Sequence, residues 1–201
     1  MNVAETIEQI RRARIVPVVR AHSADEAEKT IKNLIAAGLE AIEITLTTPD
    51  AIDLIEKYAA AEGRPPLIGA GTVVDAKSAK KCFAAGAKFI VSPIFAPEII
   101  EFCRENAVTV ISGAFTPTEI FTAWRAGADF VKVFPAHAAG GAVYIKSVKA
   151  VFPEVRLMPT GGINLDDAAL YFEAGADAVG IGSGLAALTS AKIEKALDAF
   201  S

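Results

Sequence analysis

The segment RAGADFVKV, residues 125–133, carries the pattern that decides the fold. Three further segments resemble it, namely AAGLEAIEI at 36–44, AAGAKFIVS at 84–92 and EAGADAVGI at 173–181. Each places a glycine, a residue type that often ends a helix, shortly before an apolar run typical of a buried strand. The glycines Gly38, Gly86, Gly127 and Gly175 lie about 45 residues apart, the length of two strand–helix units. The chain is therefore predicted to alternate strands and helices.

Eight apolar runs rich in Ile, Val and Phe are predicted as strands buried on both faces. Amphipathic stretches separate them, and two of these begin with helix-start signals, at Ser23-Ala-Asp-Glu26 and at Thr116-Pro117. Eight such units without a linker predict a (β/α)8 TIM barrel with an extra N-terminal helix, in a single domain over residues 1–201. An open doubly wound sheet is the alternative. The expected strands are Ile15–Arg20, Ala41–Thr45, Leu67–Ala70, Phe89–Ser92, Val108–Ser112, Phe130–Phe134, Arg156–Thr160 and Ala178–Ile181.

The composition excludes several classes of protein. With 201 residues, 52% hydrophobic, the chain is too apolar to be disordered. A net charge of −4 lacks the basic footprint of a general nucleic-acid binder. No apolar run reaches the ~18 residues of a membrane helix, and the first residues lack the apolar core of a signal peptide. We therefore expect a cytoplasmic protein with neither nucleic-acid nor membrane partners, whose Cys82 and Cys103 are buried reduced thiols.

The sharpest polar interruption of a predicted strand is Lys132 in FVKVF. Strand alternation places Lys132 on one face with Phe130 and Phe134, and chemistry in such barrels gathers at the carboxyl ends of the strands. Apolar surroundings disfavour the charged form of a lysine, and a neutral amine can attack a carbonyl to form a Schiff base. The alternative is a structural lysine that reaches solvent or pairs with a carboxylate.

A second interruption is Glu43 in AIEIT, between two isoleucines and on the same face as Thr45. A buried carboxylate needs a partner, and in a site it can serve as a general acid–base group. The alternative is a structural ion pair with an inward Lys or Arg. Both interpretations place Glu43 near Lys132.

Further candidates lie at the ends of other predicted strands. Arg20 ends the first strand and suits bidentate recognition of a carboxylate; a surface cation is the alternative. Thr72 follows the third strand and could hydrogen-bond an acid, or belong to a turn. Gly161 and Gly162, together with Ser183 in GIGSG, follow the last two strands, where such barrels bind phosphate; for either motif alone, a tight turn is the alternative.

The remaining polar residues suggest no metal site. The two histidines, His22 and His137, form no HxxxH pair and join no carboxylate cluster, and His137 is interpreted as an exposed loop residue. Lys146 and Lys149, three residues apart on a predicted helix, are interpreted as a solvated face.

The motifs together resemble the family of 2-keto-3-deoxy-6-phosphogluconate (KDPG) and 4-hydroxy-2-oxoglutarate (KHG) aldolases. The resemblance runs nearly end to end through IVPVVR, IEITLTTPDA, IGAGTV, FIVSP, GAFTPTE, DFVKVFPA, MPTGGIN and AVGIGS. It implies a class I aldolase, without metal or cofactor, that acts on a small keto acid and forms a homotrimer. By position it implies that Lys132 forms the Schiff base and Glu43 is the acid–base carboxylate. It also implies that Thr72 contacts the carboxylate of the substrate, that Gly161, Gly162 and Ser183 bind phosphate, and that Phe134 and Pro93 line the pocket.

Two positions depart from the family pattern. Many members carry Arg, which holds the substrate carboxylate, where this chain has Thr47, and the resemblance implies that Arg20 takes over that role. Many members also carry Glu where this chain has His137. Both departures concern substrate scope more than reaction type.

Three other functions remain open from the sequence. The substrate could be the phosphogalactonate stereoisomer, or the barrel could be a sugar-phosphate epimerase or isomerase that uses Glu43 as a base without an imine. Alternatively, Ala-rich helices such as AAGLEA could present the interface of an assembly protein built on an aldolase barrel.

Overall fold

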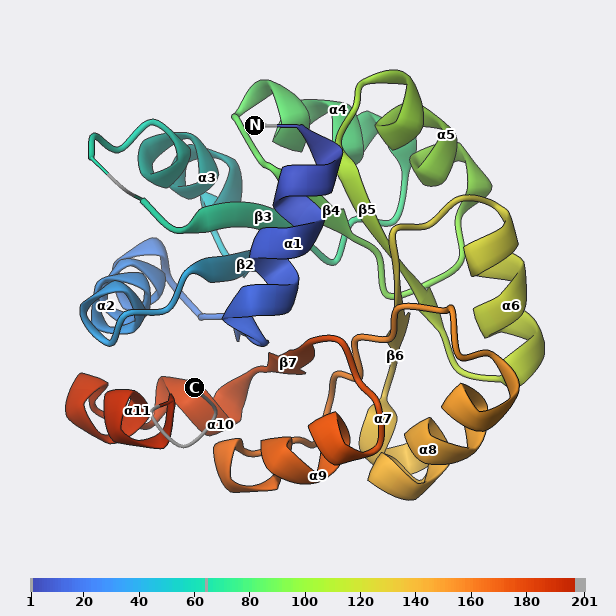
Figure 1. Cartoon of the computed structure of the whole chain (residues 1–201). Helices are drawn as coiled ribbons and strands as arrows, with labels where there is room; N and C mark the ends of the chain where they lie inside the picture. Colours follow the sequence, from blue (N-terminus) through green and yellow to red (C-terminus); the bar gives the residue numbers. More distant parts are fainter. Residues whose placement is uncertain (1, 64, 198–201) are drawn as a thin grey trace.

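The computed structural model describes residues 2–63 and 65–197 and shows an α/β fold in which a curled parallel sheet is surrounded by helices (Figure 1). The sheet has seven strands in the order β6-β5-β4-β3-β2-β1-β7, and its neighbours pair in parallel. The strands are β1 (Ile15–Val19), β2 (Ala41–Thr45), β3 (Leu67–Gly71), β4 (Phe89–Val91), β5 (Thr109–Ala114), β6 (Phe130–Val133) and β7 (Val179–Ile181).

Helices connect the strands and cover the outside of the sheet (Figure 1). None of those within the described ranges is long and apolar enough to cross a membrane. The α-helices are α1 (Val3–Ala13), α2 (Ala24–Ala36), α3 (Ala51–Ala59), α4 (Ala76–Ala84), α5 (Pro97–Glu105), α6 (Pro117–Arg125), α7 (Ala136–Ala139), α8 (Gly141–Val151), α9 (Ala168–Glu173), α10 (Ser183–Ala186) and α11 (Ser190–Leu197), with a 3-10 turn η1 (Leu165–Asp167) before α9.

The repeated glycines end helices, as predicted. Gly38, Gly86, Gly127 and Gly175 all have φ between 80° and 99°, the left-handed region that glycine enters without a Cβ penalty. After each of them, the next residue donates its N–H to the carbonyl five positions earlier, as Ala128 does to Ala123, the bond of a Schellman cap. Each cap turns the chain directly into the following strand.

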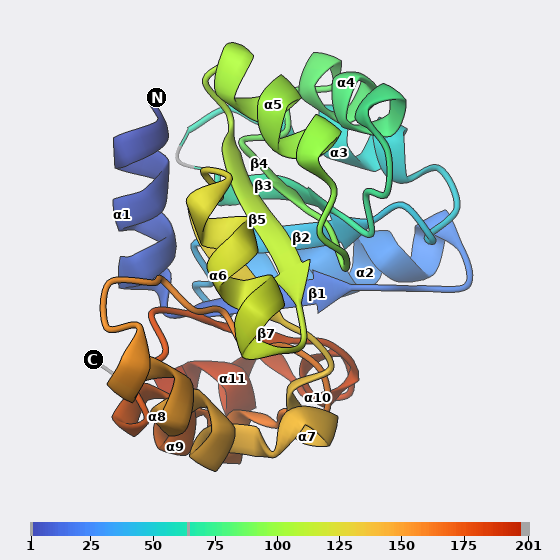
Figure 2. The same cartoon turned by 90° about the vertical axis from the view of Figure 1, so that its right-hand side faces the viewer.

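Alternation along the strands divides the core into two layers. The inner cluster consists of side chains that point to the concave face of the sheet, and Ile10 of α1 closes it at the N-terminal end. Figure 2 shows α1 at the end of the molecule opposite the arrowheads of β1 and β5. Odd residues of β6 such as Val131 and Val133 instead join the larger cluster between sheet and helices. The inner cluster is Ile10, Val16, Ala41, Leu67, Phe89, Val91, Ile111, Phe130, Met158 and Ala178.

The predicted regular strand Arg156–Thr160 is wrong as stated. The segment forms only isolated bridges, Val131 with Leu157 and Thr160 with Gly180. Pro159 has no N–H to donate to a ladder, which interrupts regular pairing. Individual backbone hydrogen bonds still link the segment to β6 and to β7 on its two sides, including Met158 N to Val131 O at 2.9 Å and Gly180 N to Pro159 O at 2.9 Å.

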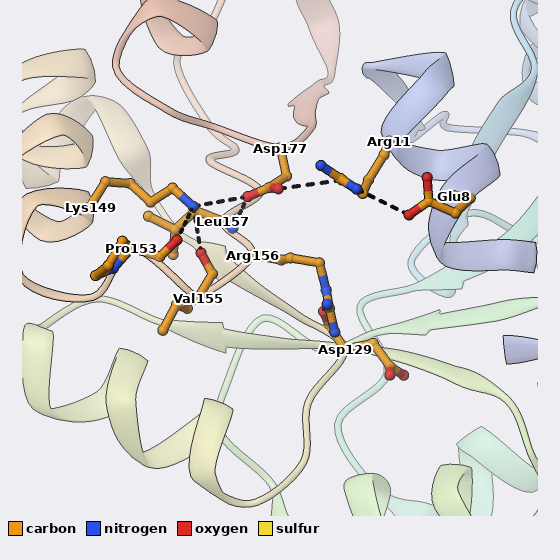
Figure 3. Close-up of polar contacts among 9 residues, drawn as sticks. All are labelled: Glu8, Arg11, Asp129, Lys149, Pro153, Val155, Arg156, Leu157 and Asp177. Carbon is orange, nitrogen blue, oxygen red and sulfur yellow. Dashed lines mark hydrogen bonds and ion pairs between the residues drawn. The ribbon is translucent and has the colours of Figure 1, made fainter. Parts of the chain in front are cut away.

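A polar cluster at the N-terminal end of the strands holds the start of this segment (Figure 3). The Asp177 carboxylate accepts from Leu157 N at 3.0 Å and from Lys149 Nζ at 3.3 Å, and pairs with Arg11 of α1. Lys149 Nζ also donates to the Val155 carbonyl at 2.9 Å. The interpretation of Lys149 as part of a solvated face is therefore wrong, whereas Lys146 is exposed as expected. A spacing of three residues places both lysines on the same side of the helix, but it does not show which of them reaches a buried partner.

Candidate active site

Lys132 lies near the carboxyl end of β6 and is buried. Its side chain comes from β6, where Phe130 on the same face belongs to the inner core cluster, and the residue is only 5% exposed. Its Nζ atom lies 5.5 Å from the centre of the ring of Phe134, the residue that follows β6. This burial excludes the alternative in which Lys132 reaches solvent, and leaves open the alternative of a lysine paired with a carboxylate.

Glu43 of β2 meets Lys132 inside the sheet. The Lys132 Nζ donates to Glu43 Oε1 at 3.4 Å, and Glu43 is fully buried. The other carboxylate oxygen, Oε2, has no hydrogen-bond partner among the described residues. Buried polar atoms are seldom left unpaired unless a function requires it. The pair thus combines an amine with a buried carboxylate oxygen that has no partner among the described residues.

Gly71, the last residue of β3, provides the space for this carboxylate. A Cβ built on Gly71 would lie 1.9 Å from Glu43 Oε1, closer than any two heavy atoms can approach without a bond. The sheet register places Gly71 directly beside Thr45, two residues beyond Glu43. A glycine at this position is therefore a steric requirement for the orientation of Glu43.

Four predicted binding residues follow the carboxyl ends of neighbouring strands. Arg20 follows β1 and is exposed, and Thr47 is exposed two residues after β2. Thr72 follows β3 in the left-handed region, with φ of 58°, a conformation that costs a non-glycine residue of order 1–3 kcal/mol and concentrates at functional sites. Pro93 follows β4 and lies against Gly113, where a Cβ would be only 2.3 Å from the Pro93 carbonyl oxygen.

The glycine-rich ends predicted to bind phosphate lie beyond residues 156–160 and β7. Gly161 and Gly162 both have positive φ, 96° and 72°, and Ser183 begins the short helix α10. A Cβ on Gly161 would lie 3.1 Å from the Phe134 ring, and one on Gly162 would lie 2.5 Å from His137 Cβ. The glycine turn is therefore packed against the segment that follows Lys132.

The comparison with known proteins agrees with this arrangement. The chain matches the family of KDPG and KHG aldolases over residues 6–198. It belongs to that family. It is 36% identical to a 2-dehydro-3-deoxy-phosphogluconate aldolase of Treponema pallidum over 82% of this chain and 78% of the relative. It is also 36% identical to a 2-dehydro-3-deoxy-6-phosphogalactonate aldolase of Escherichia coli, over 85% of this chain and 83% of the relative.

A solved structure of a family member shows the same fold. It is the KDPG aldolase of Legionella pneumophila with pyruvate captured as a covalent carbinolamine intermediate, which is 29% identical, with a TM-score of 0.82 over 93% of this chain and 96% of that one. The chain is accordingly an aldolase, a carbon–carbon lyase.

Several residues that shape the site of this aldolase were not predicted from the sequence. Thr45 and Thr48 hydrogen-bond to the segment that carries Arg20, and Gly71 makes room for Glu43. The alternation of β2 already placed Thr45 on the face of Glu43, but its partners are set by sheet register. Nothing in the local sequence marks Thr48 or Gly71.

Proposed function

We propose that this chain is a class I aldolase that reversibly cleaves KDPG to pyruvate and glyceraldehyde 3-phosphate. The same chemistry on 4-hydroxy-2-oxoglutarate gives pyruvate and glyoxylate. The observation that carries the proposal is the buried contact of 3.4 Å between Lys132 Nζ and Glu43 Oε1, beside an unpaired carboxylate oxygen. An epimerase would need a base, but it would not need an amine beside it.

The reaction begins when the neutral amine of Lys132 attacks C2 of the keto acid. Loss of water forms an iminium, which withdraws electrons from C3. Glu43, directly or through a water, accepts the proton of the C4 hydroxyl. The C3–C4 bond breaks, its electron pair moves to C3 to form an enamine, and the aldehyde leaves. Protonation of C3 and addition of water to the imine release pyruvate and regenerate Lys132, so the chemistry needs no metal or organic cofactor.

The keto-acid carboxylate is assigned to the neighbouring strand ends. Arg20 supplies the cation, and its forked guanidinium suits a carboxylate. Thr72 supplies a hydroxyl from the strained position after β3, and Thr47, whose hydroxyl contacts Thr45 Oγ1 at 3.0 Å, lines the same end of the sheet after β2. Holding the acid at one end sets the distance of C2 from Lys132, and such positioning contributes much of the rate of an enzyme.

The phosphate is assigned to the other side of Lys132. The backbone of Gly161 and Gly162 and the start of α10 at Ser183 can approach phosphate oxygens closely because glycine has no side chain. Phe134 lies between Lys132 and this turn, and with Pro93 it forms the wall along which the carbon chain of the substrate extends.

The finer architecture is also a proposal. We infer that residues 156–160 serve as the remaining strand of a closed (β/α)8 barrel with α1 as an extra helix, in one domain over residues 1–201. The backbone hydrogen bonds of the segment to both β6 and β7 support closure.

The family resemblance supports a homotrimer, and exposed Val74, Ile94 and Phe115 after β3, β4 and β5 offer an apolar contact surface. Light scattering should give three times the chain mass of 21.0 kDa. Cytoplasmic location stays a prediction from the sequence.

The galactonate stereoisomer is a second candidate substrate, because the Escherichia coli relative is named for it. The two substrates share the carboxylate, the ketone and the phosphate, and differ in stereochemistry. Comparing kcat/KM for the two sugars decides between them; we expect KDPG to be preferred.

Pyruvate and borohydride test the chemistry directly. Reduction traps an imine as a stable secondary amine, which peptide mass spectrometry can locate. We expect one adduct, on Lys132, and none in Lys132→Ala; Lys146→Ala, which changes an exposed lysine, serves as the matched control and keeps the adduct. No adduct, or adducts scattered over surface lysines, would overturn the class I mechanism.

A further inference from the structure

We propose that Thr45 and Thr48 are positioning residues that fix the backbone of Arg20 and so set the affinity for the substrate carboxylate. The inference rests on the proposed function, in which Arg20 binds that carboxylate. Its basis is a set of hydrogen bonds that hold the chain on both sides of Arg20.

The residues before and after Arg20 are each bonded to a threonine hydroxyl. Thr45 Oγ1 donates to the Val19 carbonyl at 3.0 Å, and the Ala21 N–H donates to Thr48 Oγ1 at 3.3 Å. Thr45 is fully buried and Thr48 is 3% exposed. Both threonines come from β2 and the turn after it, so the two bonds attach the Arg20 segment to the strand that carries Glu43.

Counting the hydroxyl protons shows which atom donates in each hydrogen bond of this network. A threonine hydroxyl has one proton, and that of Thr45 is used on the Val19 carbonyl. In the contacts of Thr45 Oγ1 with Thr48 Oγ1 at 3.3 Å and with Thr47 Oγ1 at 3.0 Å, Thr45 must therefore accept. Ala21 N–H, Thr48, Thr45 and the Val19 carbonyl thus form one ordered chain of donors and acceptors around Arg20.

This arrangement matters because the Arg20 side chain has no other support. The residue is exposed, and its guanidinium makes no hydrogen bond or ion pair with the other described residues. Order at this position must then come from the backbone on either side. Thr47 stands where many family members have the carboxylate-binding Arg, and here its hydroxyl joins the network that holds the replacement cation.

The test is a double-mutant cycle between Thr48 and Arg20, measured as KDPG cleavage. Thr48 is chosen because Thr45 shares the face of Glu43 and so faces the reacting centre. We expect Thr48→Val to raise KM about two- to tenfold, the effect of one lost hydrogen bond, with kcat changed less than about twofold. Thr48→Ser, which keeps the hydroxyl, restores KM. Arg20→Gln raises KM by about tenfold or more, and adding Thr48→Val to it produces no further rise.

Thr109→Val is the matched control. Thr109 is a fully buried strand threonine whose hydroxyl has no partner among the described residues, so its loss should leave KM unchanged. Should Thr48→Val not fold, Thr48→Cys carries the same expectation, because a thiol is a weak acceptor.

The possible outcomes distinguish a failure of this inference from a failure of the proposed function. Equal rises in KM from Thr48→Val with and without Arg20 would show that Thr48 does not act through Arg20, and an unchanged KM in Arg20→Gln would remove its premise; either overturns the inference. The borohydride adduct on Lys132 is measured in the same samples. Its absence from the wild-type protein would instead overturn the proposed function.

Discussion

Gly71 shows how a residue without a side chain can decide the chemistry of a neighbour. Any Cβ at this position would overlap Glu43 Oε1, at 1.9 Å, so in Gly71→Ala the carboxylate must rotate away from Lys132. We expect kcat for KDPG cleavage to fall about a hundredfold or more, the usual contribution of an acid–base group, while the Lys132 amine still forms the pyruvate adduct. Steady-state kinetics and circular dichroism check this, and a folded variant with wild-type kcat would contradict it.

The two cysteines are inert thiols whose protonation is coupled to folding. Burial raises the pKa of Cys82 to about 11 and that of Cys103 to about 12. Since both folded-state values lie above the ordinary thiol value of roughly 8.5, the folded state holds these protons more tightly than the unfolded state does. Their contribution to stability is complete below pH ~8.5 and is lost as the pH rises towards 11 and 12.

This linkage predicts alkaline destabilisation of the protein. We expect the free energy of unfolding, from guanidinium titrations, to fall between pH 8 and pH 10.5 by on the order of 1–2 kcal/mol per thiol. The fall should be smaller in Cys82→Ala/Cys103→Ala, which also controls for the tyrosines whose pKa burial raises, such as Tyr58. Equal slopes in both proteins would refute the thiol contribution.

At the scale of single elements, the polar cluster around Asp177 acts as a support for the irregular segment 156–160. Lys149 on α8 donates to Asp177 and to the carbonyls of Pro153 and Val155 (Figure 3). We expect Lys149→Ala to lower the free energy of unfolding by about 1–3 kcal/mol, since it removes the donor from the partly buried Val155 carbonyl and Asp177 carboxylate. Lys146→Ala, on the same helix but exposed, should change it by less than about 0.5 kcal/mol. Chemical denaturation of both variants gives the comparison, and similar losses would contradict the assignment.

Two of the four repeated segments carry an aspartate that accepts a hydrogen bond from a neighbouring strand segment. Asp129 and Asp177 each stand two residues after a repeat glycine, and each carboxylate accepts an N–H near the start of the neighbouring strand segment, from Val110 at 2.9 Å and from Leu157 at 3.0 Å. Desolvation raises the pKa of the Asp129 carboxyl. Acidic residues at these positions thus secure the N-terminal ends of two strand segments, which the sequence repeat alone did not reveal.

For the molecule as a whole, stability and chemistry lie at opposite ends of the sheet. Ile10 of α1 is fully buried in the inner core, whereas Lys132 and the predicted binding residues lie towards the carboxyl ends of the strands. We expect Ile10→Ala to lower the free energy of unfolding by about 2–5 kcal/mol and to leave kcat within about twofold at 25 °C. Ile35→Ala, at a partly exposed position on α2, should have a smaller effect. A large loss of kcat in folded Ile10→Ala would show that the two ends are coupled.

Much of this organisation could be predicted from local sequence. The apolar runs located seven strands, the glycine repeat located four helix caps, and the need of a buried charge for a partner placed Glu43 near Lys132. The pairing of residues 156–160, the partners of Lys149 and the left-handed Thr72 could not be predicted. The contacts of Lys149 and Leu157 with Asp177 join segments at least 20 residues apart, and no local periodicity encodes these.

The glycines of the inner strands have a consequence for how the family varies. The space that a side chain would occupy at four of these glycines is taken by a neighbour. The neighbour is the ring of Phe89 at Gly69, Glu43 at Gly71, the backbone of Pro93 at Gly113 and Thr160 at Gly180. At Gly69, Gly71 and Gly180 the neighbour is a side chain of an adjacent segment, so neither member of these three pairs can change size alone. Substitutions in this lineage should therefore arrive in pairs across adjacent strands, and a large residue at 71 should be found only where position 43 no longer carries the acid–base carboxylate.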